Sequence, residues 1–322
     1  PFLLPKDSVE ITSYRDWWGC EKLLNRKRIV FYVIGYKEVG MGHVFRALAL
    51  AHEISDHEII FVCSEKNKVA VDKIAGLDYL IYAFPEETII EDIKALKPNL
   101  VIQDVLDTTK EDVLSLKELA IPVVNFEDAG TGRGYADYCI NALYESTSND
   151  ADSIKCGPDF FFLRDEFYDA KPSVFREKLK SVLITFGGTD PENITQKTLE
   201  EVYHVCKDND IEINLVVGQG YSWFEKLEKY IDELKYPRLN YIKNTGAISK
   251  VMEKSDITIS SNGRTVFELA HMNIPTIVIS QHERESTHKF STKDNGFENL
   301  GVYSPTFKVS RITETFSKLI SD

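Results

Sequence analysis

The sequence lacks long apolar runs, paired cysteines and an excess of positive charge. No stretch reaches the 18 or so apolar residues that a transmembrane helix needs, so we expect no integral membrane segment. The five cysteines are scattered and form no CxxC pair, which argues against a structural zinc site or a disulfide framework. Such cysteine usage is typical of a reducing cytoplasm, where we expect the protein to act.

Acidic residues outnumber basic ones. Asp and Glu number 51 against 38 Lys and Arg, which gives a formal net charge of −13. This balance argues against nucleic acid as a partner, because nucleic-acid binding needs a basic face that neutralises phosphates. A small phosphorylated ligand stays possible, since it needs only one local site. The length of 322 residues predicts two domains.

Short apolar runs alternate with helical patterns from Lys27 onward. Residues 28–34 form a continuous apolar run typical of a buried parallel strand, and a Gly-rich loop and a helix at residues 44–55 follow. Further strands are predicted at residues 58–63, 79–83, 100–103, 122–125 and 138–141. The polar stretch 145–178 is predicted to connect two domains.

A second series of the same kind begins at residue 181. Its predicted strands are residues 181–186, 211–217, 239–242, 257–260 and 276–279, and its predicted helices are residues 193–205, 223–234, 247–254, 263–271, about 285–295 and 311–319. This rhythm predicts an α/β protein with two Rossmann-like parallel-sheet domains facing a cleft, residues 29–175 and 176–322. Residues 1–28 precede them, with a short strand expected at 9–11 and a helix capped by Ser13.

The first Gly-rich loop, Gly40-x-Gly42-His43-x-x-Arg46, lies between a predicted strand and a predicted helix. Glycines let the backbone approach a ligand, and a helix N-terminus offers unpaired N–H groups with partial positive charge. The same charge favours a neutral imidazole at His43, which can accept a proton from water or a hydroxyl. The alternative is a histidine that only caps the helix, and an isolated GxGH favours that alternative.

Two further turns have the same strand-to-helix setting. Gly187-Gly188-Thr189 lies opposite the first loop, where a ligand bridging the two halves would bind. The alternative is a tight turn in which Asp190 or Asn193 caps the helix, and both interpretations can hold together.

The second of these turns is Asn262-Gly263-Arg264-Thr265, which opens a helix whose free N–H groups point back at the cleft. Glu268 follows on the first turns of this helix, where a carboxylate can accept two vicinal hydroxyls such as those of ribose. The alternative, a glutamate that complements the helix dipole, is at least equally favoured by the sequence alone.

Residues 281–288 form a polar segment at the end of a predicted strand. Its two histidines, His282 and His288, lie six residues apart, which suits no helical metal site. We therefore predict no metal here. Asp104 and Asp128 each follow a strand of the first series, and Asp128 is equally well interpreted as a turn former or as part of a sugar site.

Taken together and in this order, these motifs resemble GT-B-fold enzymes. The matching segments are GMGHVFRALALA, LRDEFY at residues 163–168, FGGTDPENIT, SSNGRTVFELAHMNIPTIVIS and the RESTH that follows. They are similar to the UDP-sugar hydrolases of pseudaminic acid biosynthesis, to spore-coat polysaccharide proteins and to the family of undecaprenyl-muramoyl-pentapeptide N-acetylglucosaminyltransferases. The resemblance covers about residues 29–301.

The resemblance implies roles for individual residues. His43 is expected to activate water at the anomeric carbon of a UDP-sugar substrate, so that UDP leaves without a metal or another cofactor. The positions implied for the nucleotide and its phosphates are Gly42, Gly187, Gly188, Thr189, Ile242, Asn262, Gly263, Arg264, Thr265 and Glu268, where Ile242 meets uracil through its backbone and Glu268 takes the ribose hydroxyls. The positions implied for the sugar side are Arg46, Asp104, Asp128, Glu285, Ser286 and Thr287.

This chain also departs from the family that it resembles. The pseudaminic hydrolases have an Asp-His-Tyr-type sequence where this chain has Asp104-Val105-Leu106-Asp107, so the sugar pocket is expected to differ. The opening segment VEITSYRDWWGCEKLLNRKRI resembles the C-terminal tail of a CMP-sialic acid synthetase-type cytidylyltransferase. The chain is therefore expected to be the C-terminal module of a bifunctional protein with an upstream cytidylyltransferase domain.

Hydrolysis is ranked slightly above glycosyl transfer, in which His43 would act on an acceptor hydroxyl instead of water. A module that binds a nucleotide sugar without turnover is the alternative from another class. A Rossmann dehydrogenase is disfavoured because no GxGxxG follows either first strand. The sequence leaves the sugar, any acceptor and the oligomeric state open.

Overall fold

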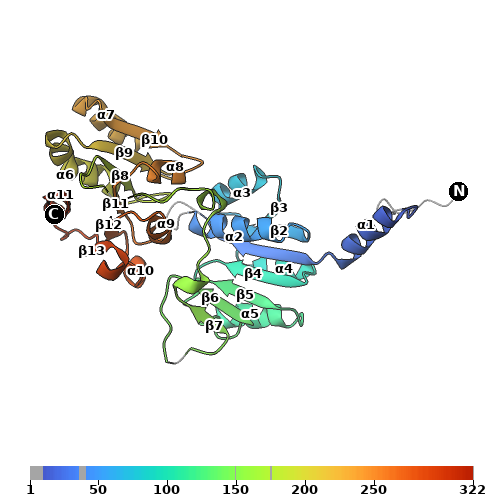
Figure 1. Cartoon of the computed structure of the whole chain (residues 1–322). Helices are drawn as coiled ribbons and strands as arrows, with labels where there is room; N and C mark the ends of the chain where they lie inside the picture. The colour runs from blue at the N-terminus through green and yellow to red at the C-terminus, as the bar shows by residue number, and fades with distance from the viewer. Residues whose placement is uncertain (1–9, 36–40, 149, 175, 322) are drawn as a thin grey trace.

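The computed structural model describes residues 10–35, 41–148, 150–174 and 176–321. Within them the chain forms two parallel sheets flanked by helices (Figure 1). The first sheet has the strand order β3-β2-β1-β4-β5-β6-β7. Its strands are β1 (Arg28–Val33), β2 (Glu58–Ser64), β3 (Leu80–Phe84), β4 (Leu100–Asp104), β5 (Val123–Phe126), β6 (Tyr138–Asn141) and β7 (Ile154–Cys156), and its helices are α2 (Gly42–Glu53), α3 (Lys68–Ala75), α4 (Ile89–Ala95) and α5 (Lys110–Lys117).

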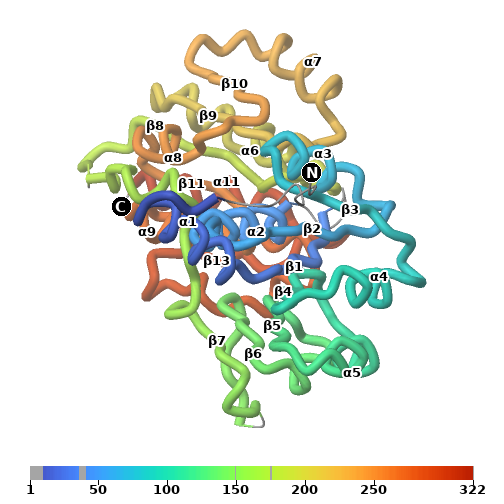
Figure 2. Tube along the Cα trace, turned by 90° about the vertical axis from the view of Figure 1, so that its right-hand side faces the viewer, coloured from blue at the N-terminus to red at the C-terminus, as the bar shows by residue number. Residues whose placement is uncertain are grey.

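The second sheet has the order β10-β9-β8-β11-β12-β13. Its strands are β8 (Ser181–Thr185), β9 (Glu212–Val217), β10 (Leu239–Lys243), β11 (Ile257–Ser260), β12 (Thr276–Ser280) and β13 (Phe297–Val302), and the helices are α6 (Ile194–Asp208), α7 (Phe224–Leu234), α8 (Ser249–Met252), α9 (Thr265–His271), α10 (Glu283–Ser286) and α11 (Ser310–Ser321). Figure 2 shows α7 and β10 at the opposite end of the molecule from β7 and α5. The predicted α/β class with two Rossmann-like sheets is confirmed.

The interior strands are stable because successive side chains are buried on opposite faces of the sheet. In β1, Phe31 and Val33 pack into the apolar cluster beneath α2, whereas Val30 packs into the cluster beneath α4 and α5 on the other face. A strand buried on both faces needs such a continuous apolar run, and this is why the run at 28–34 predicted the strand correctly. The second sheet likewise has an apolar cluster on each face.

The order of the strands fixes where a ligand can bind. In the first sheet β2 and β3 are added on one side of β1, and the strands from β4 onward are added on its other side. The switch point lies between β1 and β4, where Val33 pairs with Asp104 at the C-terminal ends of both strands. In the second sheet the switch point lies between β8 and β11. Ligands of open α/β sheets bind in the crevice outside such switch points. The loops that leave these four strands are therefore the structural candidates for the site.

Two strands were missed by the sequence analysis. β7 lies within the stretch that was predicted to be a connection only, and β13 follows a region that was predicted as one helix at about 285–295. That region instead contains α10 and a 3-10 turn at Lys293–Asn295. Both missed strands are edge strands, where one side is solvated and the apolar signal is weak. The connection itself packs on the second half, with Phe161 stacked on Phe267 at 4.2 Å between ring centroids.

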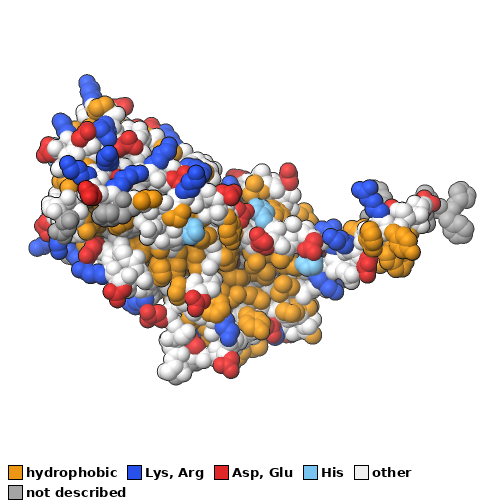
Figure 3. Space-filling view, viewed as in Figure 1, with side chains coloured by type: hydrophobic (Ala, Val, Ile, Leu, Met, Phe, Trp, Pro, Cys, Tyr) orange, Lys and Arg blue, Asp and Glu red, His pale blue; other side chains and the backbone are white. Residues whose placement is uncertain are grey.

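α1 (Tyr14–Asn25) precedes the first sheet and extends away from it (Figure 1). Its predicted cap is confirmed, because Ser13 and Asp16 form a reciprocal capping box. The strand expected at 9–11 is not seen in Glu10 and Ile11, and Val9 lies outside the described residues. Figure 3 shows apolar side chains gathered on this helix, none of which is buried. Within the described ranges no helix combines the length and apolar character needed to cross a membrane.

Candidate functional site

The Gly-rich motifs of both halves meet at the switch points. A Cβ atom placed on Gly188 would lie 3.7 Å from the backbone nitrogen of Met41, and one on Gly42 would lie 3.4 Å from Cδ of Arg264. A Cβ on Gly263 would lie 3.5 Å from Oε1 of Glu285. Segments that are 22 to 222 residues apart in sequence therefore form one site between the two sheets.

His43 is held by a buried carboxylate. Its Nδ1 lies 2.5 Å from Oδ1 of Asp104, which leads out of β4. Arg46, one turn further along α2, donates from Nε and Nη2 to the two oxygens of Asp104 at 2.6 and 2.5 Å, and from Nη1 to Glu127 at 3.2 Å. Nη2 of Arg46 also lies 3.2 Å from Nδ1 of His43, but it donates to Asp104 at the shorter distance of 2.5 Å. An ionised Asp104 can only accept, so the proton on His43 belongs at Nδ1. Nε2 is then the nitrogen left to accept a proton.

The charges of this network are fixed by burial and pairing. Burial by itself would raise the pKa of Asp104, but the Arg46 charge and the hydrogen bonds from His43 and Arg46 hold that pKa below its ordinary value. Burial raises the pKa of Glu127, and the charges of Arg46 and Arg264 offset only part of that rise. Asp104 is therefore ionised at neutral pH, which keeps the histidine oriented as a base.

Arg264 brings a cation from the second half to the same place. Its guanidinium lies 4.4 Å from the ring centroid of Phe161 and donates to the carbonyl of Phe162 at 3.2 Å. Burial, together with the like charge of Arg46, lowers its pKa to about 10, which still leaves it cationic at neutral pH. The charges of Glu127, Glu268 and Asp104 act on Arg264, but among the described residues no carboxylate forms an ion pair with it, so it is suited to an anionic ligand.

The loop at Gly187-Gly188-Thr189 presents its backbone to this site. Gly187 has φ of +77°, a conformation that favours glycine. The N-terminus of α6 behind it is already used, because Asp190 accepts from the N–H groups of Ile194 and Thr195 at 2.8 and 2.7 Å. The turn-forming interpretation of Asp190 is thus confirmed, and any phosphate contact here has to come from the loop backbone.

The two residues expected at the uridine differ in their surroundings. Glu268 is buried, and both its carboxylate oxygens accept from Arg164 at 2.8 and 3.0 Å. A carboxylate has about four acceptor positions, so a second partner stays possible. Ile242 lies in β10 with its side chain packed on the apolar cluster around Met252. The roles of both residues stay predictions.

Asp128, expected on the sugar side or at a turn, is wholly buried. It accepts from the backbone and hydroxyl of Thr108, from the Asn125 amide and from the backbone of Gly130. These bonds use its acceptor capacity within the protein. The placement favours the turn-forming interpretation and argues against a direct sugar contact. Arg46 and Asp104 are likewise buried, so they orient His43 and do not face a sugar directly.

The 281–288 segment is held by hydrogen bonds within the second half, and the expected contact of Glu285, Ser286 and Thr287 with a ligand stays a prediction. Glu285 is buried and accepts from the backbone of Gln281 at 2.7 Å. Ser286 and Thr287 donate their hydroxyls to the backbone carbonyls of Glu283 and Arg284. Asn262 donates to the carbonyls of Glu285 and His288, so its side chain ties two motifs together.

Three residues of the site were missed by the sequence analysis. Glu127 contacts Arg46, Arg164 holds Glu268, and Arg284 joins α10 to the first half through Asp107. Each pairs with a residue at least 81 positions away. Arg164 stands in the LRDEFY segment that carried the resemblance, so the sequence marked it without indicating its partner. Among the described residues, no group of three or more His, Cys, Asp or Glu is arranged to hold a metal ion.

The chain is similar in sequence to a glycosyltransferase domain and to a sugar hydrolase. Residues 182–291 match the glycosyltransferase family 28 C-terminal domain. The chain is 31% identical to protein MJ1062 of Methanocaldococcus jannaschii over 80% of the chain. It is 26% identical to a UDP-2,4-diacetamido-2,4,6-trideoxy-beta-L-altropyranose hydrolase of Campylobacter jejuni, over 84% of the chain and 98% of that protein.

Two of the relatives are much longer than this chain. The chain spans only 56% of the Methanocaldococcus protein. It is 24% identical, over 83% of the chain, to 46% of a Helicobacter pylori protein named pseudaminic acid cytidylyltransferase and UDP-2,4-diacetamido-2,4,6-trideoxy-beta-L-altropyranose hydrolase. Among solved structures, MurG of Acinetobacter baumannii superposes with a TM-score of 0.63 at 15% identity, covering 91% of each chain. This last likeness concerns the fold.

Proposed function

We propose that this chain, which is similar to UDP-sugar hydrolases and has the fold of GT-B glycosyltransferases, hydrolyses a UDP-linked acetamido sugar at its anomeric carbon. The observation that carries the proposal is the His43–Asp104 pair at the switch point, 2.5 Å apart and backed by Arg46. A base oriented in this way can act on a small nucleophile. The hydrolase relative, which the chain covers almost entirely, supports water as that nucleophile.

The reaction follows from these placements. Nε2 of His43 accepts a proton from water as the water oxygen forms a bond to the anomeric carbon. The bond between that carbon and the phosphate oxygen breaks, and its electron pair leaves with UDP. Asp104 stabilises the imidazolium that forms, while Arg46 keeps Asp104 ionised and in place. The products are UDP and the free sugar.

The leaving diphosphate needs positive potential. Arg264 supplies a cation beside Gly42, and Gly188 lies against the neighbouring Met41 across the two halves. Preorganised donors of this kind stabilise developing negative charge, and a metal ion is not required for it. We therefore propose a reaction independent of metals and cofactors. Uracil at Ile242 and ribose at Glu268 complete the proposed nucleotide site.

Glycosyl transfer is the second candidate, and the match of residues 182–291 to a glycosyltransferase domain favours it. In that case Nε2 of His43 would deprotonate an acceptor hydroxyl. A module that binds nucleotide sugars without turnover is the remaining candidate. The fused upstream cytidylyltransferase also stays a proposal, supported by the Helicobacter relative and by the resemblance of residues 9–29. A cytoplasmic location stays a prediction.

The deciding experiment is UDP release from a panel of UDP-linked acetamido sugars, with EDTA present and no acceptor. The proposal expects release by the wild type and a loss of about 10²-fold or more in kcat for His43→Ala, with the Kd for UDP unchanged. UDP binding without release would favour a transferase or a binding module. The absence of UDP binding would overturn the nucleotide-sugar proposal as a whole.

A further inference from the structure

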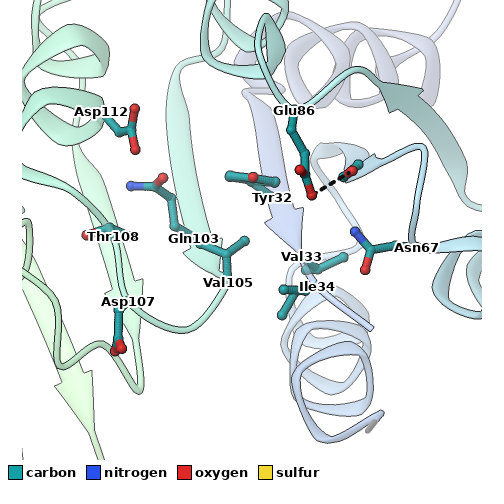
Figure 4. Close-up of a pocket in the computed structure, with 11 residues that line it drawn as sticks. Tyr32, Val33, Ile34, Asn67, Glu86, Gln103, Val105, Asp107, Thr108 and Asp112 are labelled. Atoms are coloured by element: carbon teal, nitrogen blue, oxygen red, sulfur yellow. Dashed lines mark hydrogen bonds between the residues drawn. The ribbon is translucent and has the colours of Figure 1, made fainter. Parts of the chain in front are cut away.

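A small cavity adjoins the proposed catalytic pair on the other face of the first sheet. Its volume is about 120 Å³, and Figure 4 shows the side chains that line it. Gln103 and Val105 contribute to its wall, and Asp104 lies between them in sequence with its side chain on His43. Gln103, Asp104 and Val105 all lie at the C-terminal end of β4, so the cavity and the catalytic pair share this edge of the sheet.

Gln103 presents a fixed hydrogen-bond acceptor to this cavity. Asp128 can only accept, so Nδ2 of Asn125 donates to it at 2.7 Å. Oδ1 of Asn125 is therefore the acceptor of that amide. Nε2 of Gln103 donates to that Oδ1 at 3.1 Å. Oε1 of Gln103 is left without a partner among the described residues, although the residue is only 1% exposed. This buried chain of amides sets which atom of Gln103 points outward.

Asn67 presents a fixed donor in the same cavity. Its Oδ1 accepts from the backbone N–H of Gly35 at 3.2 Å, which leaves Nδ2 to point away from that contact. Within the described part of the chain Nδ2 has no hydrogen-bond partner, and Asn67 is only 3% exposed. In Figure 4, Asn67 and Gln103 lie on opposite sides of Tyr32. Two buried amides thus offer one donor and one acceptor to a ligand.

The rest of the wall is partly apolar and partly acidic. Val33, Ile34 and Val105 supply aliphatic surface. Burial, with the charges of Asp112 and Glu86, raises the pKa of Tyr32 to about 12, so its hydroxyl keeps its proton.

The carboxylates of this wall are mostly paired within the protein. Glu86 accepts from Ser64 and Lys66, and Asp107 accepts from Arg284, which leaves Asp112 as the carboxylate without a side-chain partner among the described residues.

We propose that this cavity binds the acetamido substituent of the sugar, with Asn67 and Gln103 as its specificity-determining residues. Nδ2 of Asn67 donates to the acetamido carbonyl, Oε1 of Gln103 accepts from its N–H, and the aliphatic wall covers its methyl group. The inference rests on the proposed function, because it places the substituent relative to His43. Nothing in the hydrolysis itself requires this recognition.

Other substituents fit the cavity less well. A carboxylate or phosphate would lie against the carboxyl groups of Asp112 and Glu86 in the cavity wall, and neither of these offers it a cation. An ammonium group has no acceptor atom, so Nδ2 of Asn67 would be left buried without a hydrogen-bond acceptor. A lone hydroxyl can use the donor or the acceptor but leaves the aliphatic wall uncovered. A site built to pair buried polar groups discriminates strongly against ligands that leave them unpaired.

The test compares matched UDP-sugars that carry an acetamido, an amino or a hydroxyl group at C2, at C4 or at both. Calorimetry on full-length His43→Ala protein measures the Kd of each without turnover. We expect at least one acetamido sugar to bind about tenfold or more tightly than its hydroxyl and amino counterparts. Asn67→Asp, which keeps the acceptor for Gly35 and removes the donor, should abolish that preference and leave the Kd for UDP within about twofold.

The matched control is Asn99→Asp. Asn99 accepts from the backbone of Arg28 at the other end of β1, so the substitution has the same chemistry at a distance, and the preference should persist. Gln103→Met removes the Oε1 acceptor and should weaken the preference even if Asn67→Asp does not fold. UDP binding with no acetamido preference, an amino preference, or a preference that survives these cavity variants overturns the inference alone. No UDP binding overturns the proposed function as well.

Discussion

Arg284 in α10 donates from Nη1 to both carboxylate oxygens of Asp107 at 2.9 Å, which joins the two halves of the molecule across the site. The same guanidinium donates to the hydroxyl of Tyr144 at 2.9 Å and to the carbonyl of Glu127 at 3.0 Å. All three partners belong to the first half. A two-domain site that must admit a substrate and then exclude water needs a contact of this kind that can break and reform.

Breaking this contact is predicted to open the protein without unfolding it. Arg284→Met should increase the radius of gyration of the ligand-free protein in small-angle scattering. In a double-mutant cycle with Asp107→Asn the coupling should be about 1 kcal/mol or less, since half of the Asp107 side chain is exposed. Lys293→Met, which removes an ion pair to Glu298 within the second half, should leave the radius unchanged. An identical radius in Arg284→Met would mean that other contacts hold the halves together.

Asp104→Asn is predicted to reduce turnover more than substrate binding. The amide lacks the charge that stabilises the imidazolium on His43, so kcat should fall by about 10²–10⁴-fold with little change in KM. The substitution also leaves Arg46 partly unpaired, so stability should fall by several kcal/mol, about 3–5 for a buried pair. Urea unfolding separates the two effects. Asp137→Asn removes a partly exposed pair with Lys117 and should spare kcat. Equal kcat values in both variants would refute the role given to Asp104.

Gly218→Ala is predicted to distort the Gly187-Gly188-Thr189 loop. The new Cβ would lie 2.4 Å from Cα of Gly188 and 2.8 Å from the carbonyl of Gly187, so the backbone has to move. Overpacking of this kind costs about 1–3 kcal/mol, which corresponds to a decrease in Tm of roughly 2–10 °C. The Kd for UDP should rise as well. Gly134→Ala, whose Cβ would meet nothing within 4 Å, is the control and should keep both values.

The sequence predicted the architecture well because parallel sheets are buried on both faces. The continuous apolar runs of β1 and β8 are local features, so both strands were placed correctly, and the Gly187-Gly188 turn follows β8 as predicted. Gly42 is the first residue of α2, and Gly40 lies outside the described residues. The edge strands β7 and β13 were harder to predict from the sequence. β7 has only Ile154, Lys155 and Cys156, and such a short mixed segment does not differ from a loop in its pattern.

The pairing inside the site could not be predicted, because it depends on contacts between distant segments. Asp104 was expected at the sugar, yet it faces α2 and holds His43. Asp128 was left between two interpretations, and only its four hydrogen-bond donors show that its acceptor capacity is used inside the protein. The Arg164–Glu268 pair joins residues 104 positions apart, and no local pattern marks it.

Glu285 is predicted to make the stability of the protein depend on pH near neutrality. Burial raises its pKa from the ordinary 4.5 to about 7 in the folded protein. Between those values the unfolded chain loses the proton while the folded protein keeps it, so stability falls as pH rises from about 4.5 to 7 and then levels off. A shift of this size corresponds to roughly 3 kcal/mol.

Glu285→Gln keeps an oxygen for the N–H of Gln281 and removes the charge. The variant should therefore gain stability over the wild type at pH 8 but not at pH 4, as measured by urea unfolding at both values. Glu283→Gln, an exposed neighbour, should follow the wild type at both. A wild-type minus Glu285→Gln difference that stays constant with pH would show that Glu285 is ionised throughout this range, and its burial would then be compensated by the backbone N–H donors of Gln281 and Asn262.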